Sequence, residues 1–296
     1  MIRDVQGDQK YWLSRISHWN EALTRSWKRI SEPSQNPIYR PQYVFDTGVY
    51  QIRLLLTLYS CGIPIRELAQ HFPGLLDAWE LSNRLSDEVC KEHHLQTCRD
   101  WDFSLTNLNH YNWCFWLVGL GLCLEIPEDQ WQRLLALVGG EGEDVLLDRV
   151  IASRSPERRI GPALLHAKPY ARLLKAVNAS KAQQAPLLRE FVDHWYAELK
   201  RPAPKNRKAP TVQPFWYIWG DPEKHPLEMG SYFGRWCIEA VAAVKAFGLD
   251  DSLCLGHEHY PGDLLRPNGP STHPAREEAP EPTRSWFSRL FEKKKR

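Results

Sequence analysis

Apolar positions recur at helical spacing along most of the chain. Between Tyr11 and Ile30 they stand three and four residues apart, which is the spacing of one face of an α-helix. Comparable patterns predict helices at 44–60, 65–71, 75–95, 105–124, 127–138, 144–152, 162–178 and 180–200. The chain has neither the repeated alternation of apolar and polar residues nor the strand–helix rhythm that a sheet would need. The sequence therefore predicts an all-α fold.

The stretch from Met229 to Leu265 carries the densest pattern. A set of apolar side chains at three- and four-residue steps predicts a helix of about four to five turns, and it comprises Tyr232, Phe233, Trp236, Cys237, Ala240, Val244 and Phe247. Gly248 is suited to end that helix, because glycine adopts the left-handed conformation without a Cβ penalty. Beyond Asp250 and Asp251 we expect an extended segment fixed by Tyr260, Pro261, Asp263 and Leu264.

Proline, glycine and charge divide the chain into parts. Gly139, Gly140 and Gly142 mark a break that predicts two packed helical domains, residues 1–139 and 140–265. Residues 200–214 hold four prolines and five basic residues, which indicates an exposed mobile loop. Residues 215–219 (FWYIW) are interpreted as an aromatic plug into the bundle. Residues 266–296 form a proline-rich basic tail, predicted to be disordered in its first half and a short amphipathic helix in its second.

Composition restricts the class of protein. The 296 residues carry a net charge of only +2, and residues 266–296 alone hold eight Lys/Arg against four Asp/Glu. The part before the tail is therefore slightly acidic, and direct nucleic-acid binding is not expected. The most apolar run, 113–124, is shorter than the roughly 20 residues that span a bilayer, and the N-terminus has no apolar signal core. The seven cysteines form no C-x-x-C pair, so we expect a reducing, cytoplasmic location without stable membrane association.

Two groups of residues invite a catalytic or metal-binding interpretation. Glu239 lies on or beside the apolar helix face, where a carboxyl of raised pKa could act as an acid or base. The structural alternative, which we favour, is a buried Glu bonded to a neighbouring Tyr, Trp or Arg. His257-Glu258-His259 alternates possible zinc ligands, but it lacks the H-E-x-x-H spacing and a further ligand. We expect a polar surface loop, no metal and no cofactor.

Two acidic patches are the candidate contact surfaces. Glu141, Glu143, Asp144 and Asp148 form one patch, and Asp221, Glu223 and Glu228 form the other. Such patches are most often solvated faces, and their functional interpretation is an electrostatic match for a basic partner. The phosphate-binding loop, dinucleotide-binding and serine-hydrolase motifs are absent from the sequence. An enzyme is therefore not the favoured interpretation, and binding is.

One combination of motifs resembles a known family. The segment YFGRWCIEA, residues 232–240, is followed by LDDS at 249–252 and YPGDL at 260–264. This combination resembles the signature of the PoNi-type immunity proteins, and LYSCGIP at 58–64 resembles the short Tyr-Ser-x-Gly element of that family's N-terminal domain. The resemblance implies a two-domain helical antitoxin that protects bacteria from type VI secretion nuclease effectors. Neither the basic loop nor the basic tail is explained by it.

The resemblance implies function through protein contact. The partner is then a cognate nuclease effector, and its basic DNA-binding cleft would attract the acidic patches. A distinct group of residues in the signature is of types that pack, so we expect it to be structural: Tyr232, Gly234, Trp236, Glu239, Asp250, Asp251, Tyr260, Pro261 and Asp263. Complexes of 1:1 and 2:2 stoichiometry, the latter with a homodimer, both stay open.

Two alternatives belong to other classes of protein. One is a metal-dependent hydrolase that uses His257, His259 and nearby carboxylates. The other is an adaptor for nucleic acid or a membrane surface that acts through the basic loop and the basic tail.

Overall fold

The computed structural model describes residues 1–94, 103–199 and 221–275, and within these ranges every regular element is helical, as predicted. The first half contains α1 (Gln9–Ser31), α2 (Arg40–Cys61), α3 (Ile65–Leu68), α4 (Phe72–Glu92), α5 (Leu108–Cys123) and α6 (Glu128–Leu137). The second contains α7 (Val145–Ala152), α8 (Ala167–Asn178), α9 (Lys181–Leu199) and α10 (Ile238–Phe247). None of the helices within the described residues is both long and apolar enough to cross a membrane.

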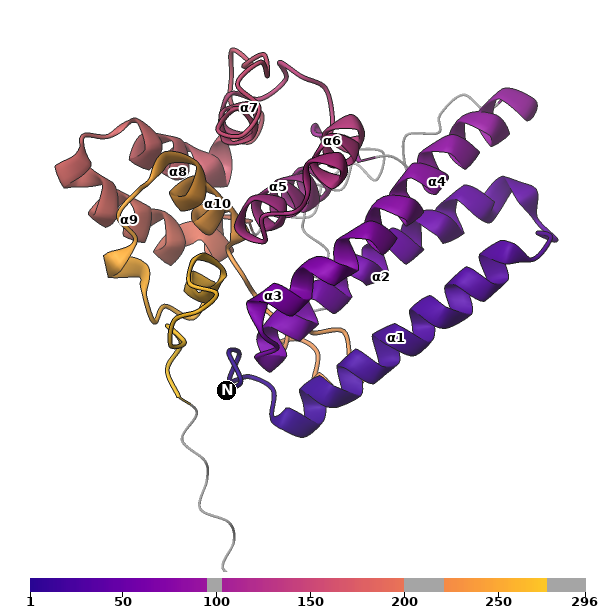
Figure 1. Cartoon of the computed structure of the whole chain (residues 1–296), viewed down its shortest axis with the longest axis horizontal. Coiled ribbons are helices and arrows are strands. Elements are labelled where there is room, and N and C mark those ends of the chain that lie inside the picture. The colour runs from indigo at the N-terminus through magenta and orange to yellow at the C-terminus, as the bar shows by residue number, and fades with distance from the viewer. Residues whose placement is uncertain (95–102, 200–220, 276–296) are drawn as a thin grey trace, which may run out of the picture.

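The long helices α1, α2 and α4 lie side by side at one end of the molecule (Figure 1). Local sequence sets their ends. Asp8 caps α1 by accepting a hydrogen bond from the backbone N–H of Tyr11, at 2.7 Å. Gly62 ends α2 at φ +91°, a conformation that glycine adopts without steric cost. Pro73 stands in the first turn of α4, where its missing N–H would have no helical partner.

Helix α5 runs through the middle of the molecule and packs on α10 (Figure 1). Most of its side chains are buried, as expected for the most apolar run. Gly119 permits the contact: a Cβ on Gly119 would lie 2.9 Å from both Ala242 Cβ and Ile238 Cγ2. Because α5 belongs to the first half of the chain and α10 to the second, one continuous apolar core serves both halves.

Of the remaining helices, α7, α8 and α9 contact α10. Helices α8 and α9 pair with each other on one side of it, and α7 lies at the opposite edge of the molecule from α1 (Figure 1). Acidic residues Glu128 and Asp129 occupy the first turn of α6, where the helix dipole favours negative charge. Trp131 of α6 donates through its indole N–H to Ser155 Oγ at 2.8 Å.

Two predictions about the C-terminal part are wrong. The helix predicted from residue 232 begins only at Ile238, and residues 231–237 have no regular secondary structure. Their apolar side chains are buried by long-range contacts, so the helical spacing of Tyr232, Phe233 and Trp236 is not a helix face. The start of the tail is ordered rather than disordered, since Arg266, Thr272 and His273 bond to Asp251, Asp263 and Tyr59, although residues 267–270 are exposed.

Other predictions lie outside the described residues. These are the mobile loop at 200–214, the aromatic plug at 215–219 and the amphipathic helix in the second half of the tail. Of the seven cysteines, five are free thiols: Cys61, Cys114, Cys123, Cys237 and Cys254. Cys90 is disulfide-bonded, which the expectation of a reducing location did not include.

Candidate functional site

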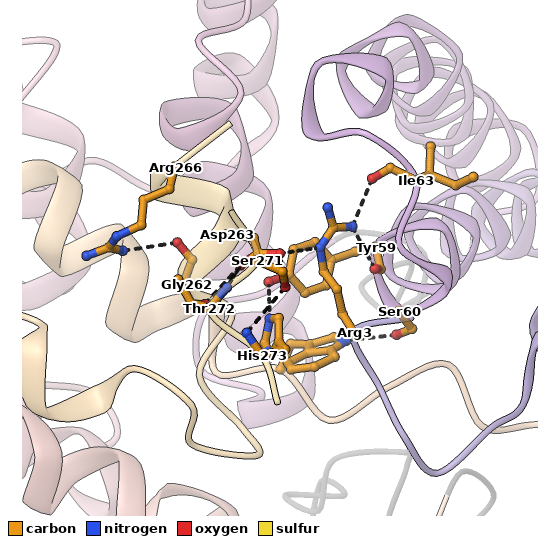
Figure 2. Close-up of polar contacts among 11 residues, drawn as sticks. Arg3, Tyr59, Ser60, Ile63, Gly262, Asp263, Arg266, Ser271, Thr272 and His273 are labelled. Carbon is orange, nitrogen blue, oxygen red and sulfur yellow. Dashed lines mark hydrogen bonds and ion pairs between the residues drawn. The ribbon is translucent and has the colours of Figure 1, made fainter. Parts of the chain in front are cut away.

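Residues 260–273, together with Arg3, Tyr59 and Ser60, form a closure that we call the clasp (Figure 2). At its centre Asp263 accepts hydrogen bonds from Arg3 Nε at 2.7 Å, Ser271 Oγ at 2.8 Å and the Thr272 backbone N–H at 2.6 Å. Burial acts to raise the pKa of Asp263, but the donors from Thr272, Arg3 and Ser271 together lower it. Asp263 is therefore an ionised carboxylate that holds the N-terminus, the first half of the chain and the C-terminal segment together.

A second set of contacts joins α2 to the signature segment. The indole N–H of Trp236 donates to Ser60 Oγ at 2.8 Å, and Ser60 Oγ lies 3.2 Å from the carbonyl oxygen of Phe233. Gly234, between them, has φ +103°, and a Cβ there would lie 2.3 Å from Trp236 Nε1 and 2.4 Å from Ser60 Oγ. Only glycine fits this approach. The segment around Gly234 was predicted to be helical, and the structure has this close approach of non-helical backbone instead.

Buried polar pairs complete the junction of the two halves. Tyr59 Oη lies 2.8 Å from His273 Nε2, and burial lowers the pKa of His273 to about 4. Tyr232 donates its hydroxyl to Asp4 at 2.6 Å, and burial raises the pKa of Asp4. Each pair links a residue of the first 60 positions to one beyond 230.

The acidic end of the signature is also internal. Asp251 accepts hydrogen bonds from Tyr260 Oη at 2.5 Å and from both terminal nitrogens of Arg266, at 2.6 and 2.9 Å. Pro261 stands at the N-cap of the short 3-10 helix Gly262–Leu265. Asp250, by contrast, is exposed and bonds the backbone N–H of Ser252 at 2.9 Å. These residues fix the backbone and offer no reactive centre.

Glu239 is fully buried at the start of α10. Its Oε1 accepts from Tyr170 Oη at 2.6 Å, Trp195 Nε1 at 3.2 Å and Asn112 Nδ2 at 3.2 Å. Burial raises the pKa of Glu239, although the hydroxyl of Tyr170 and the indole of Trp195 act against that rise. Tyr170 and Trp195 are of the types that the structural interpretation named, whereas Asn112 is not, and none of the three donors is exposed to solvent.

Three members of the acidic patches are not on the surface. Asp144, Asp148 and Asp221 are only 0%, 1% and 3% exposed. Asp144 caps α7 by accepting from the backbone N–H groups of Leu146 and Leu147, at 2.9 and 2.8 Å. These three were predicted as contact residues, and their burial corrects that prediction. The error arose because spacing along the sequence cannot tell a capping or paired Asp from a solvated one.

The other two buried aspartates are held by arginine. Asp148 pairs with Arg158 Nε at 2.7 Å, with both side chains nearly inaccessible. Asp221 pairs with Arg235 Nη2 at 2.7 Å and with Lys224 at 3.2 Å. Their charges are therefore paired with cations of the protein itself.

The other four members of the patches are exposed, namely Glu141, Glu143, Glu223 and Glu228. Glu141 and Glu143 precede α7, whereas Glu228 lies in the 3-10 helix Leu227–Met229. The segment 229–232 contacts α1, because Arg15 donates to the Gly230 carbonyl oxygen at 3.0 Å and Tyr11 to the Tyr232 carbonyl oxygen at 2.8 Å. Since α7 and α1 lie at opposite edges (Figure 1), the patches form two separate surfaces.

The histidine pair is not arranged as a metal site. His257 Nε2 lies 3.2 Å from Asp193 Oδ1, and His259 is buried beside the rings of Trp195 and Tyr196. Burial lowers the pKa of His259 to about 4. Across the described part of the chain, no three His, Cys, Asp or Glu side chains are grouped to hold a metal ion. His259 is therefore a buried packing residue rather than the surface residue that was expected.

Comparison with solved structures first identifies the fold. The crystal structure of protein PA2201 from Pseudomonas aeruginosa matches with a TM-score of 0.65 and 18% sequence identity, over 90% of this chain and 89% of that one. No curated protein matches the sequence.

Two family models then identify the family. The model for the N-terminal part of the PoNe immunity proteins (PoNi) matches residues 3–136, and the model for their C-terminal part matches residues 142–264. The chain belongs to the PoNe immunity protein family. The resemblance noted in the sequence is thereby confirmed.

Sequence reasoning missed several residues of this junction. Arg3, Asp4 and His273 were not singled out, because each lies in a segment without helical periodicity and its partner is more than 200 positions away. Proline and charge content assigned the start of the tail to disorder. No local signal in the sequence could have paired Arg3 with Asp263.

Proposed function

We propose that this protein binds a cognate PoNe nuclease toxin and neutralises it by direct protein contact, without enzymatic chemistry of its own. One observation carries the proposal: the two PoNi models together match both halves of the chain. The geometry also supports the proposal, because the polar groups of the signature make hydrogen bonds and ion pairs that hold the two halves together. They leave the exposed surface as the part that acts.

The proposal places the protein in the bacterial cytoplasm, where a toxin injected by a neighbour through a type VI secretion system would have to be met. Neutralisation there needs tight binding rather than turnover. No cofactor or metal enters the proposal. Five thiols are held inside or partly inside the fold, where they act as small apolar side chains.

Exposed acids are the proposed contact with the toxin's DNA-binding cleft. A cleft that receives DNA must be positively charged to hold the phosphates, so carboxylates attract it and compete with DNA for it. Of the two surfaces, the one with Glu223 and Glu228 is favoured. The neighbouring Met229 is 56% exposed there and supplies an apolar contact beside the charges.

Co-expression tests the proposal. The nuclease toxin encoded beside this chain is produced in a bacterial host with and without the protein, and the complex is purified through a tag on the toxin. We expect growth to be restored and the two chains to be recovered together. Loss of viability despite ample soluble protein, or recovery of the toxin alone, would overturn the proposal.

Charge reversal then separates the two acidic surfaces. The double variant E223K and E228K should weaken toxin binding by about tenfold or more, and E141K with E143K should have a smaller effect. The double variant E67K and E88K is the matched control, because both of these glutamates are exposed and lie outside the patches. Equal binding by all three variants would exclude acidic recognition.

A further inference from the structure

A groove lined by arginine runs between α1 and α2, and neither the signature nor the acidic patches account for it. Two adjoining hollows of about 470 and 670 Å³ share Arg25 and Tyr43 in their walls. The first also includes Met229, Gly230 and Ser231, and the second reaches the connection between the two helices. We name the two hollows together the α1–α2 groove. Its cationic side chains are Arg15, Arg25, Lys28, Arg29, Arg40 and Arg53.

Negative charge in the walls of this groove is small. Glu32 is the single carboxylate among the residues that line the two hollows. Glu21 lies 3.6 Å from Arg25, but the two side chains are 64% and 66% exposed, so the pair is weak in water. The groove is therefore strongly positive, although the part of the chain before the tail is slightly acidic.

Three of the cations, Arg15, Arg29 and Arg40, are held in place by neutral groups. Arg15 donates to the Gly230 carbonyl oxygen at 3.0 Å, and Arg40 donates to that of Ile30 at 2.8 Å. The guanidinium of Arg29 lies 5.5 Å from the ring centre of Tyr43. Carbonyls and rings fix the side chains without cancelling their charge. A preorganised set of cations binds an anion with a smaller entropic cost.

Arg53, in the wall of the groove, is a buried cation whose charged form is disfavoured by burial. Its guanidinium lies 5.5 Å from the ring centre of Trp19 and 5.9 Å from that of Tyr50. Burial lowers the pKa of Arg53 to about 10, although Tyr50 and Asp46 act to raise it. An anion in the groove would stabilise this charge.

The composition of the groove favours a protein as its occupant over nucleic acid. Five of its six cations are arginine and one is lysine, and protein interfaces are enriched in Arg, Tyr and Met and depleted in Lys. Tyr39 in one hollow is 65% exposed, and Met229 in the other is 56% exposed. Such side chains are typical anchors of protein contacts.

We infer that the α1–α2 groove binds a carboxylate-rich strip of the PoNe toxin that lies outside the toxin's DNA-binding cleft. The inference rests on the proposed function and adds to it. A cationic groove cannot cover a cleft built for phosphates, because like charges repel. Glu228 directly precedes the groove residue Met229. The groove and the neighbouring glutamates thus form one continuous contact surface with positive and negative charge. Binding in the groove would orient the protein so that Glu223 and Glu228 face the cleft.

The test compares two charge-reversed proteins by calorimetric titration with a catalytically inactive form of the toxin. The variant R25E with K28E changes two exposed side chains of the groove, and K10E with R66E changes two exposed side chains elsewhere. We expect the groove variant to bind at least about tenfold more weakly and to lose much of the salt dependence of binding. The control should stay within about threefold of the wild type.

A third protein removes an anchor without changing charge. Tyr39→Ala should weaken binding by about tenfold, as expected for a contact anchor. Circular dichroism and thermal unfolding confirm the fold of each variant. A labelled single-stranded oligonucleotide is the competing probe. If the variant R25E with K28E loses oligonucleotide binding but keeps the wild-type affinity for the toxin, the inference is overturned.

The remaining outcomes separate the inference from the proposed function. Wild-type affinity of the groove variant for the toxin overturns the inference and leaves the proposed function standing. Failure of the wild-type protein itself to bind the toxin overturns the proposed function, and the inference with it.

Discussion

The indole nitrogen of Trp236 lies 2.8 Å from the hydroxyl oxygen of Ser60, a residue 176 positions earlier in the chain. This bond joins the two parts that the PoNi models match separately. The signature residues around it, including Gly234 and Asp263, serve the same junction. The family signature therefore marks the contacts that join the two halves, and the proposed function assigns toxin binding to a different set of side chains.

Asp263→Ala should be strongly destabilising. The substitution removes the carboxylate that pairs with Arg3 and accepts from Thr272, and it leaves a nearly buried guanidinium without its partner. We expect the free energy of unfolding to fall by about 3 kcal/mol, measured by urea titration. Asp250→Ala removes an exposed cap from Ser252 and should lower the free energy of unfolding far less than Asp263→Ala does. Equal losses in the two variants would show that the clasp carries no special stability.

Gly234→Ala tests the close approach at Ser60. At φ +103° a Cβ would lie 2.3 Å from Trp236 Nε1, so both backbone strain and a steric clash are expected. Gly248, at φ +64°, has nothing within 4 Å of its Cβ position and serves as the control for strain alone. We expect Gly248→Ala to cost about 1 kcal/mol and Gly234→Ala at least about twice that. Thermal unfolding of both variants gives the comparison, and a tolerated Gly234→Ala would contradict the described packing.

Glu239 should make stability depend on pH in an unusual direction. Burial raises its pKa in the native state above the usual 4.5. As pH rises above 4.5, the unfolded chain loses this proton while the native protein keeps it, so the unfolded state is favoured. Relative to Glu239→Gln, the wild type should lose up to about 1.4 kcal/mol of unfolding free energy per pH unit until its native pKa is passed.

The measurement for Glu239 is a set of urea titrations of both proteins from about pH 4 to about pH 7. The difference between the proteins isolates Glu239 from other titrating groups, such as His273. Curves that stay parallel over the whole range would show that the carboxyl is ionised in the native protein.

Helices were predictable because their signals are local. Apolar spacing located α1 and α5. The same spacing failed at 232–237, where large side chains fill a junction between distant segments. Gly234 was the one local sign against a helix there, because glycine is unfavourable in a helix interior.

The candidate surface was only partly predictable, because burial of a charge depends on its partner. Asp148 and Asp221 were interpreted as surface residues, but they are buried in ion pairs with Arg158 and Arg235. The sequence contains one signal of the α1–α2 groove, namely the basic residues on the polar face of α1. The same pattern predicts a solvated helix face equally well. Only the packing of α2 and of residues 229–231 beside it makes a groove.

Titration of the purified protein into a nuclease reaction of its toxin tests the central claim most directly. The account predicts that DNA cleavage falls in proportion to the protein added and stops at about one equivalent, as tight binding requires. Cleavage that continues undiminished at about tenfold molar excess of folded protein would contradict neutralisation by direct contact.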